Sequence, residues 1–233
     1  MNSACPASTR RRDLFQFLVG YLLILAVIWS PRPIQRPLYI VAVIFIAASI
    51  WVSFDSWSAM GLRRRNFLHS LWIPAIALLL AAIAVVIAIH EHTLHPVGGP
   101  ALYLRSFWGY AIWSFAQQLL LQGFFLARLL RLLPTERAAV VAAASIFALA
   151  HLPNPILTSM TLVWGLIACF LFLRYRNLYP LAIAHAILGV CLAITIPGPV
   201  IRNMRVGLGY LAYPHRNLHR PHTHPGGIAA AIF

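Results

Sequence analysis

The feature that most constrains the fold of this chain is a series of long apolar segments joined by short, basic connections. A helix satisfies its backbone hydrogen bonds internally, so segments of this length and apolarity can cross the hydrocarbon core of a bilayer. We therefore predict an all-α fold, a polytopic membrane helical bundle. About seven transmembrane helices are expected, at residues 14–30, 38–54, 67–90, 104–131, 137–152, 156–175 and 178–196.

The composition agrees with a membrane location. The chain is 61% hydrophobic and only 9% charged, with a mean hydropathy of +0.80, whereas a soluble domain carries about 25% charged residues. The formal net charge of +14 comes from arginines in short clusters between apolar segments. This placement follows the positive-inside rule for membrane proteins. We expect membrane lipid as a partner and no nucleic acid.

The arginine clusters also predict an orientation. Clusters at residues 10–12 and 63–65 fall on one side of the predicted bundle, whereas Arg32, Arg36 and Arg105 fall on the other. Because cytoplasmic connections carry the excess of basic residues, the N-terminus is predicted to lie in the cytoplasm. We expect an integral protein of a bacterial inner (cytoplasmic) membrane.

The predicted helices define four parts of the chain. Residues 1–13 are expected to form a cytoplasmic tail, and residues 14–103 three N-terminal transmembrane helices. Residues 104–196 are expected to form a core of four transmembrane helices. Residues 197–233 remain as a C-terminal tail, whose side of the membrane the charges leave open.

The fourth predicted helix contains three glutamines, Gln117, Gln118 and Gln122, within an otherwise apolar stretch. Their helical positions, together with those of Ser114, Arg128 and Arg131, fall within about half of the circumference. A primary amide in hydrocarbon costs a few kcal/mol unless it forms hydrogen bonds. We expect these side chains to face protein or water and to line a polar cavity inside the bundle.

Two histidines fall in neighbouring predicted helices, His151 at the end of the fifth and His185 inside the seventh. An ionisable residue within a membrane helix indicates function by default. The alternative is a buried histidine that donates a hydrogen bond to a backbone carbonyl of a neighbouring helix. Since two histidines and three glutamines occur on three nearby helices, we favour one shared site.

These polar residues occur in an ordered set of short patterns. Residues 117–122 read Gln-Gln-Leu-Leu-Leu-Gln and precede Gly123 and Phe124; Phe147 and His151 form Phe-x-x-x-His; Gly189 follows His185 by four residues. The set resembles the motifs Glu-Glu-x-x-x-Arg, Phe-x-x-x-His and His-x-x-x-Asn/Asp of the CAAX protease and bacteriocin-processing (CPBP, or Abi) family of intramembrane endopeptidases. The type II CAAX prenyl endopeptidases belong to this family. The resemblance covers about residues 108–196.

The resemblance implies a role for each matching residue. Gln117 takes the general-base position, His151 positions the attacking water, and His185 stabilises the oxyanion. Gln118 and Gln122 take the positions of a supporting Glu–Arg ion pair, and as neutral residues four apart they can keep a hydrogen bond. The substrate implied is a peptide or a membrane protein.

The sequence departs from the family pattern at the residues that matter most. Gln117 cannot accept a proton as a glutamate can, and general-base assistance is typically worth about 10²–10⁴ in rate. Gly189 carries no amide, so one oxyanion donor is also lost. The sequence therefore supports two hypotheses: an intramembrane endopeptidase, or a catalytically impaired relative that acts as a membrane scaffold or peptide-binding chaperone. A small transporter is disfavoured because no inverted repeat is visible.

Metal binding is a weaker hypothesis. Two histidines and an amide make a poor metal site without a carboxylate, so no cofactor is predicted for the central site. The loop with His90, Glu91, His92 and His95 could hold a divalent metal, but it is not an HExxH motif. The C-terminal tail contains a further histidine group, for which a solvated tail that faces anionic lipid is the favoured interpretation: His215, His219, His222 and His224.

Overall fold

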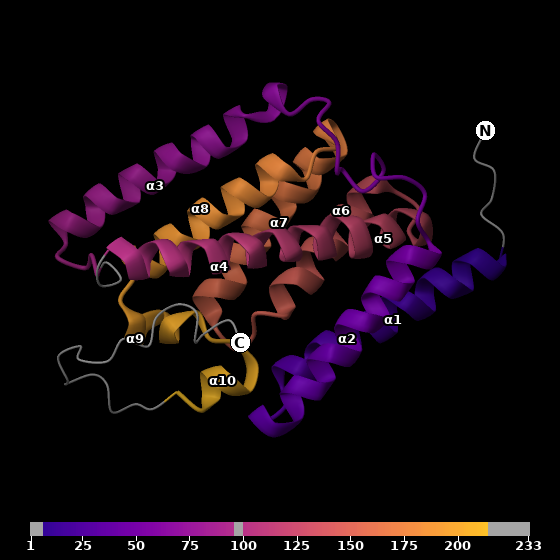
Figure 1. Cartoon of the computed structure of the whole chain (residues 1–233), viewed down its shortest axis with the longest axis horizontal. Coiled ribbons are helices and arrows are strands. Elements are labelled where there is room, and N and C mark those ends of the chain that lie inside the picture. The colour runs from indigo at the N-terminus through magenta and orange to yellow at the C-terminus, as the bar shows by residue number, and fades with distance from the viewer. Residues whose placement is uncertain (1–6, 96–99, 214–233) are drawn as a thin grey trace.

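The computed structural model describes residues 7–95 and 100–213, and within these ranges all regular structure is helical (Figure 1). The predicted all-α fold is confirmed. The helices are α1 (Ala7–Ile28), α2 (Arg32–Val52), α3 (Trp72–His90), α4 (Pro100–Gln118), a π-helix (Leu119–Leu126), α5 (Ala127–Leu132), α6 (Glu136–Leu149), α7 (Pro155–Tyr175), α8 (Tyr179–Thr195), α9 (Gly198–Ile201) and α10 (Gly207–Leu211), with 3₁₀ turns at Leu68–Ser70 and Arg202–Met204.

The outer surface of the bundle is apolar, as expected for contact with lipid. Large apolar side chains such as Ile44, Leu78 and Phe170 have 63%, 61% and 66% of their surface exposed. Three helices in the described ranges are long and apolar enough to cross a membrane, namely Arg32–Val52, Leu68–His90 and Pro155–Tyr175. Further apolar helices accompany them, so the chain forms an integral membrane helical bundle.

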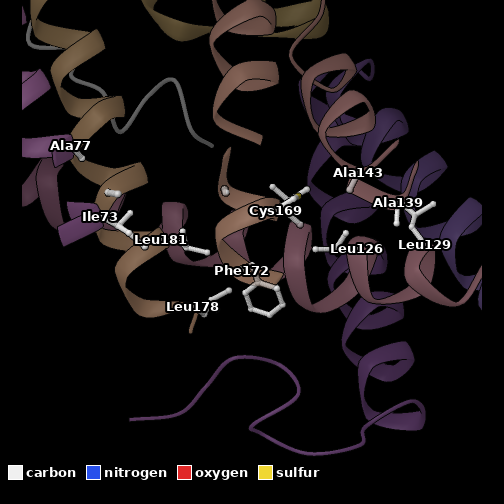
Figure 2. Packing of buried hydrophobic residues seen from close by; sticks show 13 residues of the cluster. Ile73, Ala77, Leu126, Leu129, Ala139, Ala143, Cys169, Phe172, Leu178 and Leu181 are labelled. Atoms are coloured by element: carbon white, nitrogen blue, oxygen red, sulfur yellow. The ribbon is translucent and has the colours of Figure 1, made fainter. Parts of the chain in front are cut away.

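Helix α6 packs against α7 through small side chains. A β-carbon added at Gly165 of α7 would lie 3.2 Å from both the Cα and the Cβ atom of Ala144 on α6. Small residues allow close approach of helix backbones in membranes, where van der Waals packing drives association. Figure 2 shows the adjoining core, which includes Ile73, Ala77, Leu126, Leu129, Ala139, Ala143, Cys169, Phe172, Leu178 and Leu181.

Helices α1 and α2 run side by side as a hairpin, and Figure 1 places them apart from the adjacent pair α3 and α8. A polar cluster holds this hairpin to α5. The guanidinium of Arg128, only 1% exposed, donates to the Gln16 side chain and to the backbone carbonyls of Ser49 and Phe124. A buried cation is tolerated only when its donors are satisfied, so this arginine stabilises the attachment of the hairpin.

The first helix begins at Ala7, inside the predicted N-terminal tail of residues 1–13. An ion pair at its first turns stabilises this start: Arg131 donates to both carboxylate oxygens of Asp13, at 2.6 and 3.0 Å. The Asp13 side chain is fully buried in this contact. Residues 10–13 are therefore part of the bundle.

The fourth predicted helix is interrupted by the π-helix, which begins directly after Gln118. A π-helix has i→i+5 hydrogen bonds, so its wider turns change the direction in which the following residues point. The prediction that these polar side chains face protein rather than lipid is confirmed for Gln118, Gln122 and Arg128, which are 0%, 0% and 1% exposed, but they contact different helices. Gln118 contacts His185 of α8, whereas Arg128 contacts α1 and α2.

The start of the predicted C-terminal tail folds back onto the bundle through α9 and α10. The Asn154 side chain caps α7, where its Oδ1 accepts from the Leu157 amide, and it donates to the carbonyls of Ile201 and Arg205. The amide of Gly207 donates to the carbonyl of Leu152 at 2.8 Å. The histidines predicted in the remaining tail, from His215 onward, lie outside the described residues.

Candidate functional site

A chain of neutral hydrogen bonds occupies the centre of the bundle. Gln118, at the end of α4, and Gln122, in the π-helix, are both fully buried. The Gln122 Nε2 donates to the Gln118 Oε1 at 3.3 Å, and the Gln118 Nε2 donates to the His185 Nδ1 at 3.0 Å. The hydrogen bond predicted between the two glutamines is therefore confirmed. It joins the π-helix to α8 without a buried charge.

This chain determines the tautomer of His185. The ring lies on α8 and is only 6% exposed. A neutral imidazole has one N–H donor and one acceptor nitrogen. Because Nδ1 accepts from Gln118, the proton of the neutral ring resides on Nε2. His185 is consequently a hydrogen-bond donor through Nε2.

His151 has the opposite arrangement. It follows α6 in a turn, two residues beyond the last helical residue, Leu149. Its Nδ1 lies 2.7 Å from the carbonyl oxygen of Phe147. A carbonyl oxygen can only accept, so Nδ1 carries the proton and Nε2 is a free acceptor. The carbonyl belongs to the preceding turn of the same segment, not to a neighbouring helix.

The two histidines share a neighbour. The ring of Phe147 makes edge contacts with both, at centroid distances of 5.0 Å to His151 and 6.1 Å to His185. The second and third motifs noted in the sequence therefore meet around one aromatic ring, and the first motif joins them through the hydrogen bond between Gln118 and His185. A hydrogen-bond acceptor nitrogen on His151 and an N–H donor on His185 therefore lie in the same part of the bundle.

A broad cleft opens onto these residues. Its volume is about 3370 Å³, far above the ~300–1,000 Å³ of a small-molecule pocket, so it is a space between helices that extends to the α1–α2 hairpin. Gln117, His151 and His185 all line it, whereas Gln118 and Gln122 lie behind its wall. None of the lining residues is acidic.

The family comparison covers the helices that form this site. Residues 99–191 match the family model described as type II CAAX prenyl endopeptidase Rce1-like. This part of the chain is therefore similar to the Rce1-like family. The Rce1-like segment includes all three motif regions and runs from the start of α4 into α8. No curated protein and no solved structure matches the chain.

The loop after α3 does not assemble a metal site. The Nδ1 of His90 lies 3.3 Å from the Glu91 carboxylate in an exposed contact, and the Nδ1 of His95 donates to the Thr93 carbonyl at 2.8 Å. Within residues 7–95 and 100–213, no group of three or more His, Cys, Asp or Glu side chains is positioned to hold a metal. His90, His92 and His95 are thus not brought together as ligands.

The structure adds two residues that the sequence analysis did not select. Trp164 of α7 lies 6.0 Å from the His185 ring, and its buried Nε1 has no hydrogen-bond partner among the described residues. Tyr110 of α4 lines the same cleft and is 7% exposed. Tyr110 precedes Ser114 and Gln118 at spacings of four, so a helical stripe in the sequence could have indicated it. Nothing in the sequence indicates Trp164.

Proposed function

We propose that this chain is an intramembrane endopeptidase in which His151 acts as the general base. The observation that supports this most directly is the opposite hydrogen bonding of the two histidines: His151 presents a free acceptor nitrogen and His185 presents an N–H donor. Acyl transfer from a peptide to water needs both functions, a base for the water and a donor for the carbonyl oxygen.

The proposed reaction proceeds through a tetrahedral intermediate. The Gln117 amide and the His151 Nε2 hold a water molecule beside the scissile carbonyl. His151 takes a proton from this water as its oxygen bonds to the carbonyl carbon, and the His185 Nε2–H donates to the developing oxyanion. The C–N bond then breaks, and the proton on His151 passes to the leaving nitrogen. The products are a carboxylic acid and an amine.

Gln117 determines how fast this reaction runs. An amide orients water through hydrogen bonds but does not accept a proton. The rate is therefore expected to fall below that of a carboxylate-assisted enzyme by about 10²–10⁴. His151 alone then carries the proton.

The cleft suggests the class of substrate. It is far wider than a small-molecule pocket, is bordered by apolar helices and accommodates an extended peptide segment or part of a membrane protein. The family description adds prenylated peptides as a candidate class. We propose that the protein works in a bacterial inner membrane with its N-terminus in the cytoplasm, as the arginine distribution predicts.

One observation favours a second candidate function, a non-catalytic scaffold or peptide-binding chaperone. The only acidic residues of the sequence are Asp13, Asp55, Glu91 and Glu136, and none of them lines the cleft. A cleft without a carboxylate retains its shape and its hydrogen-bond donors, which are sufficient to bind a peptide.

A hydrolysis assay distinguishes the two functions. Purified protein in lipid nanodiscs is incubated with prenylated and unprenylated peptides, and the products are measured by mass spectrometry. We expect slow cleavage that is abolished in His151→Ala and His185→Ala, and a rise of about 10²–10⁴ in kcat for Gln117→Glu. Cleavage that persists in His151→Ala would contradict the proposed mechanism. Peptide binding without cleavage by either wild type or Gln117→Glu would establish the second candidate.

A further inference from the structure

Tyr110 of α4 and Gly189 of α8 fit together in a way that only glycine allows. A β-carbon added at Gly189 would overlap the hydroxyl oxygen, the Cζ and the Cε1 atoms of Tyr110. A clash with three atoms of a rigid ring cannot be relieved by a small rotation. The Tyr110 hydroxyl therefore occupies the volume that a side chain at position 189 would take.

The packing around Tyr110 keeps its hydroxyl at this position. The ring is 7% exposed and packs against Ala186 and Val190, the residues of α8 on either side of Gly189. Ring packing of this kind leaves a tyrosine few rotamers. The end of the side chain is thereby held against the backbone of α8.

Position 189 lies one helical turn beyond His185, so the two positions are neighbours on the same side of α8. Tyr110, His185 and Gly189 all line the cleft. A tyrosine hydroxyl is a donor as well as an acceptor. The two residues that carry these neutral donors, Tyr110 of α4 and His185 of α8, thus line the same cleft.

We infer that Tyr110 is a catalytic residue that donates a hydrogen bond to the oxyanion together with His185. The inference builds on the proposed endopeptidase function. Gly189 provides no polar group of its own at this point of α8, and the phenol supplies one from the opposite helix. The Tyr110 hydroxyl then replaces the polar group that a side chain at position 189 would provide.

Tyr110→Phe tests the inference because it removes one oxygen and keeps the ring. We expect kcat for peptide hydrolysis to fall by about 10²–10³, as for the loss of one oxyanion donor, with KM little changed. Tyr175→Phe is the matched control, since Tyr175 of α7 is a partly buried tyrosine outside the residues that line the cleft. It should keep the wild-type kcat.

A binding measurement provides a second readout that does not require turnover. A peptide with a phosphinate in place of the scissile amide presents a tetrahedral, negatively charged group. Tyr110→Phe should weaken binding of the phosphinate peptide by the same factor as kcat and leave binding of the parent amide peptide unchanged. A purely structural role of Tyr110 predicts equal changes for both peptides, or none.

A paired substitution tests directly whether the Tyr110 hydroxyl replaces a donor at position 189. Tyr110→Ala opens the volume beside α8, and Gly189→Asn introduced in the same protein restores a donor there. We expect the double variant to hydrolyse peptide faster than Tyr110→Ala alone, whereas Gly189→Asn alone should impair folding because its side chain overlaps Tyr110.

The outcomes separate this inference from the proposed function. If wild type hydrolyses peptide and Tyr110→Phe keeps full kcat and full phosphinate affinity, the role of Tyr110 is rejected and the endopeptidase function stands. If wild type neither hydrolyses peptide nor prefers the phosphinate over the amide, both are rejected. A selective loss in Tyr110→Phe, with Tyr175→Phe unchanged, supports both.

Discussion

Gln118 and Gln122 are chemically identical, fully buried and four residues apart, yet their replacement by methionine should have different effects on stability. Methionine is close to glutamine in length and fills the same space, so the comparison isolates the amide. Gln118 bonds to both Gln122 and His185. The Gln122 Nε2 donates to Gln118, and the Gln122 Oε1 has no hydrogen-bond partner among the described residues.

The expected magnitudes follow from these contacts. In Gln118→Met two hydrogen bonds are lost, each worth about 0.5–1.5 kcal/mol, and the His185 Nδ1 and Gln122 Nε2 lose their partners. The free energy of unfolding should fall by about 2–4 kcal/mol. In Gln122→Met one hydrogen bond is lost and Gln118 Oε1 becomes unpaired, but the unpaired Gln122 Oε1 is removed. The number of unpaired buried oxygens is therefore the same before and after Gln122→Met. The free energy of unfolding should fall by about 1 kcal/mol or less.

Unfolding in mixed detergent micelles, followed by circular dichroism during a titration with sodium dodecyl sulfate, measures both values. Peptide hydrolysis provides a parallel readout. Gln118→Met also removes the hydrogen bond that fixes the tautomer of His185, so kcat should fall. Equal destabilisation by the two substitutions would refute the reasoning, because it would mean that Gln122 Oε1 has a partner of its own. Equal kcat values for wild type and Gln118→Met would refute the tautomer argument.

Two further predictions concern the bundle. Gly165→Leu should lower the free energy of unfolding by about 1–3 kcal/mol through overpacking against Ala144, seen as a lower melting temperature; Gly109→Ala, where no atom lies within 4 Å of the added carbon, should leave it unchanged or slightly raised. Asp13→Asn removes the fully buried carboxylate that pairs with Arg131. The free energy of unfolding should fall by an amount near the lower end of about 3–5 kcal/mol, because Arg131 is partly exposed. A melting temperature that stays at the wild-type value in Gly165→Leu or Asp13→Asn would contradict the respective contact.

The sequence predicted the helical membrane bundle because the length of an apolar segment depends only on residues that are neighbours in the chain. Each predicted apolar segment overlaps one of the longer helices. In hydrocarbon, where no water is present, an apolar segment forms its backbone hydrogen bonds internally by becoming a helix. The sequence also predicted the hydrogen bond between Gln118 and Gln122, because a spacing of four residues brings side chains together on a helix.

The sequence did not indicate two features of the helices, the π-helix and the first turn of α1. The π-helix at Leu119–Leu126 lies between Gln118 and Arg128, and no residue type in that stretch marks the change of hydrogen-bonding pattern. The start of α1 at Ala7 was also missed, because it is stabilised by an ion pair with Arg131, distant in sequence.

By itself, the sequence determined that this protein folds in a membrane. It also determined the approximate bounds of the helices and the set of polar residues available for a site. The tertiary structure alone decided what those residues can do. The proton position on His185 follows from the Gln118 amide of another helix, and the Tyr110 hydroxyl occupies the space beside Gly189 of another helix. Hydrogen-bond direction and steric fit depend on atoms distant in the chain, so they become fixed only when the helices pack.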